Sequence, residues 1–141
     1  MNVQRRAANI AFMYHDNDAA WRQDIVGYCA MLRRQGLIAF VDQAKYMVMP
    51  RSDIILILIS SDFLASDKLV SAAYYAIHHR TGDQRIIPIL VRKVNLEQDF
   101  PELHALKGFP AQGKTLEGAR FKSEVLTEIA QGIRQIASRH G

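Results

Sequence analysis

The feature that most constrains the fold is an unbroken run of six aliphatic residues, Ile54 to Ile59, followed by Ser60, Ser61 and Asp62. A run of strand length with no polar alternation predicts a strand that is buried on both faces, as in a parallel sheet. The polar residues after it predict the start of a helix, because their side-chain oxygens can accept the free N–H groups of a first turn. In open α/β sheets, the turn between such a strand and its helix lies where ligands bind.

Composition supports a globular protein and excludes several classes. The 141 residues suit one domain spanning 1–141, with 49% hydrophobic and 23% charged residues. The net charge of +4 is scattered along the chain, so we expect no nucleic-acid partner. Cys29 is the only cysteine, which rules out an internal disulfide or a cysteine metal cluster, and we expect no metal site. No secretory segment or membrane-spanning run is present, which predicts a soluble cytoplasmic protein without a membrane partner.

Strand and helix patterns alternate along the chain. We expect strands at 9–14, 37–41, 54–59 and 85–91, a brief fifth strand before the loop at 109–114, and helices at 62–79, 99–106 and 121–138 and over the apolar stripe that follows the first strand. This alternation predicts a doubly wound parallel sheet of four to five strands with helices on both faces. Pro88 lacks an N–H donor, so the last strand should lie near a sheet edge or carry an irregularity.

Helical spacing also predicts which side chains face the core. Asp16 and Asp18 should cap the first helix, and Gly36 should end it. The inward residues of the helices are predicted as follows: Trp21, Ile25, Tyr28, Cys29 and Leu32 in the first, Leu64, Leu69, Ala73 and Ile77 in the second, and Phe121, Val125, Ile129, Ile133 and Ile136 in the last.

Five ordered segments carry a family resemblance. They are IAFMYHDNDAAW, LRRQGLIAFVD, SDIILILISSDFLASD, RIIPILVR and the amphipathic final helix. Together they resemble bacterial Toll/interleukin-1 receptor (TIR) domains over nearly the whole chain. The resemblance implies a flavodoxin-like sheet. It also implies one of two functions: signalling by self-association or by binding another TIR domain, or hydrolysis or cyclisation of NAD by effectors of antiphage defence.

The first departure from the family concerns its catalytic glutamate on the third helix. The resemblance places Ala73, or a near neighbour, at that position, and the chain has no glutamate before Glu97. A methyl group cannot hold a ribose hydroxyl, and losing one such polar group costs on the order of 10²–10³-fold in rate. We therefore predict no catalytic residue of the family type. Asp62, Asp67 and His15 are the fallback candidates, although Asp62 is better explained as an N-cap and Asp67 as a first-turn charge.

The second departure follows Asp42. Family members have a long Pro-Gly loop and a full helix there, and that loop mediates TIR–TIR contacts and borders the nucleotide pocket. In this chain only residues 43–51 separate Asp42 from Ser52. One wall of the pocket should therefore be shortened.

Residues at the carboxyl ends of the strands would form the rim of any nucleotide pocket. They are Tyr14, His15, Asp16, Asp42, Ser60, Ser61 and Asp62. Each has a plainer interpretation, since a solvated turn histidine is a more common role for His15 than acid–base chemistry. Tyr74 and Tyr75 are our candidates for a protein interface, with ordinary packing as the alternative.

Three hypotheses follow. The first is a TIR-like interaction module, homo-oligomeric or bound to another TIR domain, that lacks catalysis and has no resident cofactor. The second is an NAD⁺ nucleosidase with a relocated catalytic residue. The third is a sensor that binds NAD or an NAD-derived nucleotide without turnover.

Overall fold

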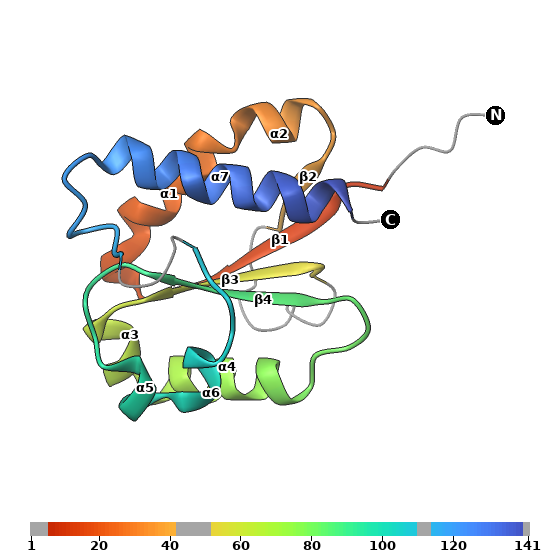
Figure 1. Cartoon of the computed structure of the whole chain (residues 1–141). Helices are drawn as coiled ribbons and strands as arrows, with labels where there is room; N and C mark the ends of the chain where they lie inside the picture. The colour runs from red at the N-terminus through yellow and green to blue at the C-terminus, as the bar shows by residue number, and fades with distance from the viewer. Residues whose placement is uncertain (1–5, 42–51, 110–113, 140–141) are drawn as a thin grey trace.

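Four parallel strands form the centre of the molecule (Figure 1). The computed structural model describes residues 6–41, 52–109 and 114–139. The strands are β1 (Ala8–Met13), β2 (Ile38–Phe40), β3 (Ile54–Ile59) and β4 (Arg85–Leu90). Their order in the sheet is β2-β1-β3-β4, with every neighbouring pair parallel. This is the order of a flavodoxin-like, doubly wound fold, as the sequence predicts.

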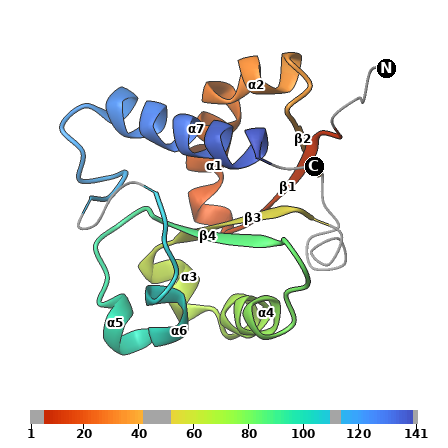
Figure 2. The same cartoon turned by 45° about the vertical axis from the view of Figure 1, so that its right-hand side comes forward.

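Helices cover both faces of the sheet (Figures 1 and 2). One face carries α1 (Ala19–Tyr28), α2 (Ala30–Arg34) and α7 (Lys122–Ser138), with the short 3₁₀ helix η1 (Asp16–Asp18) leading into α1. The other face carries α3 (Ser61–Ala65), α4 (Asp67–His78), α5 (Leu96–Asp99) and α6 (Pro101–His104). None of the described helices is both long and apolar enough to cross a membrane.

The aliphatic run of β3 supplies the core on both sides. Ile54, Leu56 and Leu58 pack with α1, α2 and α7, whereas Ile55, Ile57 and Ile59 pack with the helices of the opposite face. All six side chains are at most 1% exposed. The prediction of a strand buried on both faces is confirmed, because a strand alternates its side chains between faces and both faces are covered by helices.

Two predicted helices are each broken in two. The stretch 62–79 contains α3 and α4, separated at Ser66, whose backbone is extended (φ −93°, ψ 108°). The Ser66 hydroxyl accepts a 3.2 Å hydrogen bond from the Leu69 N–H and starts a second helix. The first helical stretch also breaks, at Cys29, but without a side-chain cap. The short helix predicted over 99–106 is also wrong in its bounds, because Asn95 caps α5 and Pro101 starts α6.

Several predicted caps and inward faces are also wrong. Ser60, not Asp62, caps α3, and His15 caps η1, whereas Asp16 lies within that turn and Asp18 makes no capping hydrogen bond. Tyr28 is 44% exposed, because the spacing of Ile25, Cys29 and Leu32 already fills the inward stripe. Phe121 is 55% exposed, because it precedes the first turn of α7 and so lies outside the helical register.

Strand β4 lies at an edge of the sheet, as Pro88 predicts. In the described residues no fifth strand pairs with it. Instead, the following segment covers its outer edge: the N–H groups of Phe109, Leu116 and Glu117 donate to the carbonyls of Pro88, Leu90 and Val91. Gly108 and Gly132 allow this close approach, since a Cβ on Gly108 would lie 2.0 Å from the Pro88 oxygen and one on Gly132 would lie 2.4 Å from the Phe109 ring.

Candidate functional site

The carboxyl ends of β1, β3 and β4 lie together at one edge of the sheet and define a rim of polar residues. Tyr14, His15 and Asp16 follow β1, and Ser60, Ser61 and Asp62 follow β3. Topology therefore brings these six predicted rim residues to one edge, while their role in binding stays a prediction. Asp42, the seventh, and the shortened loop after it lie outside the described residues.

A buried hydrogen bond joins Ser60, at the end of β3, to Asp18 in η1. Ser60 Oγ donates to Asp18 Oδ2 over 2.5 Å, and both residues are 0% exposed. Ser60 Oγ also accepts from the Phe63 N–H at 3.2 Å, so one hydroxyl caps α3 and binds the carboxylate. The second carboxylate oxygen, Asp18 Oδ1, is buried and has no hydrogen-bond partner among the described residues. A buried carboxylate of this kind needs a nearby cation.

Arg92, two residues after β4, provides that cation. Its Nη1 lies 3.9 Å from Asp18 Oδ1 and 3.5 Å from Asp62 Oδ2, and its Nε donates to Glu117. The hydrogen bond to Glu117, reinforced by the charges of all three carboxylates, raises the pKa of Arg92 above its ordinary value. We call these four residues the Arg92 cluster. It connects the ends of β3 and β4 to η1 and fixes the charged groups of the rim.

The turn after β1 is also held by internal contacts. His15 Nδ1 accepts the Asn17 N–H at 3.0 Å, which leaves any ring proton on Nε2. Asn17 Nδ2 in turn donates to Asp62 Oδ2 over 3.3 Å. Two of the fallback catalytic candidates, His15 and Asp62, thus serve as a cap and as a partner of Arg92.

Ala73, at or near the position where the resemblance places the family glutamate, points into the core. Ala73 is 0% exposed and packs with Leu69 and Ala76 of α4 against the sheet. Asp67, the third fallback candidate, is exposed in the first turn of α4, as a charge favoured by the helix dipole should be. Among the described residues, Asp67 forms no hydrogen bond or ion pair with the rim.

Tyr74 and Tyr75 lie on the solvent side of α4, 44% and 60% exposed. Each ring contacts a histidine one turn later: the Tyr74 and His78 centroids are 4.3 Å apart, and those of Tyr75 and His79 are 4.0 Å apart. We call these four residues the α4 aromatic patch. The adjacent histidines face different tyrosines, and no described group of three or more His, Cys, Asp or Glu side chains is placed to hold a metal ion.

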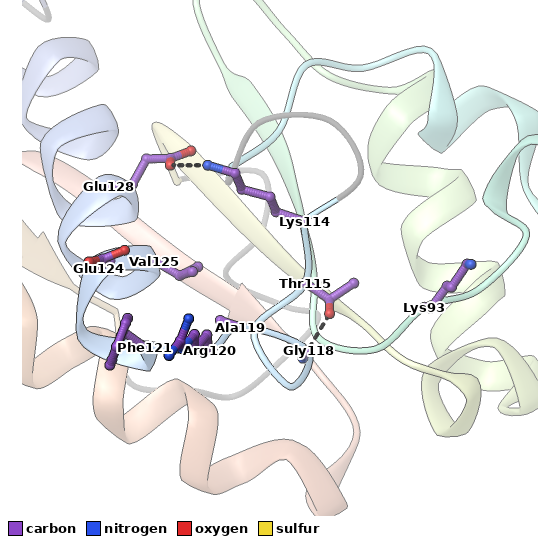
Figure 3. A pocket seen from close by; sticks show the side chains of 10 residues that line it. All are labelled: Lys93, Lys114, Thr115, Gly118, Ala119, Arg120, Phe121, Glu124, Val125 and Glu128. Carbon is purple, nitrogen blue, oxygen red and sulfur yellow. Dashed lines mark hydrogen bonds and ion pairs between the residues drawn. The ribbon is translucent and has the colours of Figure 1, made fainter.

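A pocket of about 580 Å³ lies beside the Arg92 cluster, between the segment after β4 and the start of α7 (Figure 3). Lys93, Lys114, Arg120, Phe121 and Glu128 are among its lining residues. Figure 3 shows Lys114 facing Glu128, a 3.8 Å ion pair, and Arg120 beside Phe121, with the guanidinium carbon 5.3 Å from the ring centroid. Three cations face Glu124 and Glu128 in this lining, and the small positive excess with one aromatic ring suits an anionic ligand with a flat group.

The sequence reasoning missed Arg92, Glu117 and the buried role of Asp18. Arg92 follows β4 as His15 follows β1, so the rule that ligand-facing residues come after strands could have selected it. No sequence pattern links Glu117 to Arg92, because a loop brings the two together.

Comparison with known proteins finds no matching family model. The uncharacterized protein y4lF of Sinorhizobium fredii is 27% identical over 145 residues, covering 93% of this chain and 44% of that protein. The chain therefore spans less than half the length of this curated relative. Among solved structures, the TIR domains of the activated Roq1 resistosome, which directly recognises the pathogen effector XopQ, align with 13% identity and a TM-score of 0.45, covering 96% of this chain and 86% of that one. This partial likeness carries no information about activity.

Proposed function

We propose that residues 1–141 form a TIR-like interaction module that self-associates or binds another TIR domain, in signal transduction or antiphage defence, without turning over NAD. The observation that carries this proposal is the α4 aromatic patch. Tyr74 and Tyr75 occupy adjacent exposed positions, and each ring contacts a histidine, tilted against His78 for Tyr74 and stacked on His79 for Tyr75. Tyrosine is enriched at protein interfaces because it supplies a large contact area at low entropic cost.

The chemistry at the rim supports a non-catalytic role. The resemblance places Ala73, or a near neighbour, where enzymatic TIR domains carry a glutamate, and Ala73 presents only a buried methyl group. Two carboxylates at the rim, Asp18 and Asp62, are each paired with Arg92. A general acid or nucleophile must be able to reach a substrate, and these groups are committed to internal contacts.

Light scattering across a concentration series tests the proposal. We expect the wild-type chain to assemble, and Tyr75→Ala combined with Tyr74→Ala to weaken assembly at least about tenfold, since one anchoring aromatic residue contributes about 2 kcal/mol or more and about 1.4 kcal/mol is a factor of ten. Tyr28→Ala is the matched control, because Tyr28 is as exposed as Tyr74 (44%) but lies on α1 across the sheet. A monomer at every concentration, with no TIR partner bound, would disprove the proposal.

Nicotinamide release from NAD under assembling conditions tests the absence of catalysis. We expect no turnover by the assembled chain. Clear turnover would favour the nucleosidase hypothesis, and alanine variants of Asp62, Asp67 and His15 would then identify the relocated group. Asp62→Ala also removes a partner of Arg92, so a stability measurement must accompany the activity of that variant.

The pocket beside the Arg92 cluster favours a second candidate function, a sensor of NAD-derived nucleotides. Phe121 could stack on a base while Lys93 and Arg120 bind phosphates. A ligand that binds only the folded state raises apparent stability, so ADP-ribose should raise the melting temperature. Lys93→Gln should abolish that rise, whereas Lys107→Gln, at an exposed lysine that does not line this pocket, should preserve it.

A further inference from the structure

A second concave site lies at the opposite, amino-terminal end of the sheet. Its volume is about 540 Å³, and its walls include Arg80, Arg85, Arg139, Asp83 and Ile136. Figure 1 shows the end of α7 and the start of β4 on the same side of the molecule, away from the rim. We call this site the arginine pocket. Its volume falls within the range of about 300–1,000 Å³ that is typical of small-molecule sites.

Three segments of the chain contribute arginines to the lining of this pocket. Arg80 follows α4, Arg85 begins β4, and Arg139 is the C-cap of α7. None of the three side chains has a hydrogen bond or an ion pair among the described residues. Favourable placement near helix C-termini accounts for Arg80 and Arg139 singly. The helix dipole does not explain why Arg85 lines the pocket, nor why all three arginines line the same cavity.

The carboxylates of the pocket do not balance these arginines. Asp53 Oδ1 is already paired with Arg6 at 3.2 Å, and its Oδ2 accepts the Asn9 N–H at 2.8 Å. Asp83 is therefore the one lining carboxylate that opposes the arginines among the described residues. The pocket is left with a net charge of about two positive units, a strong attraction for a multiply charged anion.

We propose that the arginine pocket binds an oligophosphate group, either free or carried by a small molecule such as a nucleoside polyphosphate. Guanidinium groups are planar forks that bind phosphate oxygens in pairs, so three arginines can hold two or more phosphates. The pocket is larger than a single phosphate, and Ile136 gives it a short apolar wall. This function is separate from self-association through α4.

Calorimetric titration of the full chain at constant ionic strength tests the proposal. The probes are sodium triphosphate, pyrophosphate and orthophosphate, and we expect affinity to fall in that order because fewer arginines are engaged. ATP forms a second arm: tighter binding than triphosphate identifies a nucleotide as the source, and equal binding identifies the anion alone. Absence of triphosphate binding, or tighter binding of a single-stranded oligonucleotide than of either probe, would overturn the proposal.

Matched variants distinguish binding in the arginine pocket from non-specific attraction to the positive charge of the chain. Arg85→Gln combined with Arg139→Gln should weaken triphosphate binding by at least tenfold. Arg134→Gln with Arg33→Gln removes the same charge from exposed arginines outside the pocket and should leave affinity unchanged. Equal weakening by both pairs would overturn the proposal.

Two further substitutions keep the test valid if the double variant folds poorly. Asp83→Asn removes the opposing carboxylate and should tighten binding severalfold. Arg85→Lys keeps the charge but loses the fork, so its affinity should fall between that of the wild type and that of Arg85→Gln. No change in either variant would contradict the proposed geometry.

Discussion

Ser60 Oγ donates a 2.5 Å hydrogen bond to Asp18 Oδ2, and this bond connects the end of β3 to the turn after β1 in a fully buried setting. The two residues are 42 positions apart in the chain. Removing the donor would leave a buried carboxylate with neither oxygen hydrogen-bonded, because Asp18 Oδ1 already lacks a partner among the described residues.

Ser60→Ala should therefore lower the free energy of unfolding by about 2–4 kcal/mol, combining the loss of a cap with the loss of a hydrogen bond to a charged group. Urea denaturation measures this change. Ser66→Ala is the control, since Ser66 caps α4 through the Leu69 N–H without a buried carboxylate, and it should cost only about 1 kcal/mol. Equal costs for the two variants would show that the Asp18 contact is not stabilising.

Gly132→Ala should destabilise the protein by about 1–3 kcal/mol although alanine favours helices, because the new methyl group would lie 2.4 Å from the Phe109 ring. Gly27→Ala, at a helical position with no atom within 4 Å, should stabilise by up to about 1 kcal/mol. Thermal denaturation should show a lower melting temperature for Gly132→Ala and a higher one for Gly27→Ala. Gly132→Ala should cost less in a Phe109→Ala background than in the wild type, and an equal cost in both backgrounds would rule out the clash.

The free energy of unfolding should fall at alkaline pH, because the buried Cys29 thiol resists deprotonation in the folded state. Burial raises the pKa of the Cys29 thiol from 9.0 to about 11. Because the folded state holds this proton more tightly, its contribution is complete below pH 9 and is lost as pH rises toward 11, a change on the order of 2 kcal/mol. The stability difference between wild type and Cys29→Ala, measured at several pH values, should shrink across this window. A constant difference would contradict the prediction.

Tyr74→Phe should change the titration of Glu102. The Tyr74 hydroxyl donates to Glu102, which lowers the pKa of that carboxyl and raises the pKa of the phenol. Any contribution of this bond is present above the ordinary carboxyl pKa and is lost as pH falls through the lowered value. An NMR titration should show the Glu102 pKa rising in Tyr74→Phe, whereas Tyr75→Phe should leave it unchanged.

The sequence predicts the fold well because its strongest signals are local. The aliphatic run of β3 implies burial on both faces, Pro88 implies an edge strand, and Gly36, with φ of 75°, ends the first helical stretch. Ala73 also lies inward as its spacing predicts. These features depend on neighbours within a few residues, which helical and strand periodicity describe directly.

The rest depends on contacts between distant segments. The role of Arg92 depends on its ion pairs with Asp18, Asp62 and Glu117, which come from three other parts of the chain. The arginine pocket likewise joins the segment after α4 with residues of β4 and α7 and the C-cap of α7. At Ser66 the chain could continue one helix or start a new one. The Ser66 hydroxyl accepts the Leu69 N–H and so starts a new helix.

The covered edge of β4 bears on how copies of this chain can meet. Pro88 offers no donor there, and the carbonyls of Pro88, Leu90 and Val91 are already occupied. At the other edge of the described sheet, β2 contributes only the three residues Ile38–Phe40. Open strand edges are the usual templates for runaway cross-β growth. In the described part of the sheet, the edge of β4 is covered and β2 is short, so we expect copies that associate to do so through helix surfaces and to form finite, reversible complexes rather than fibrils.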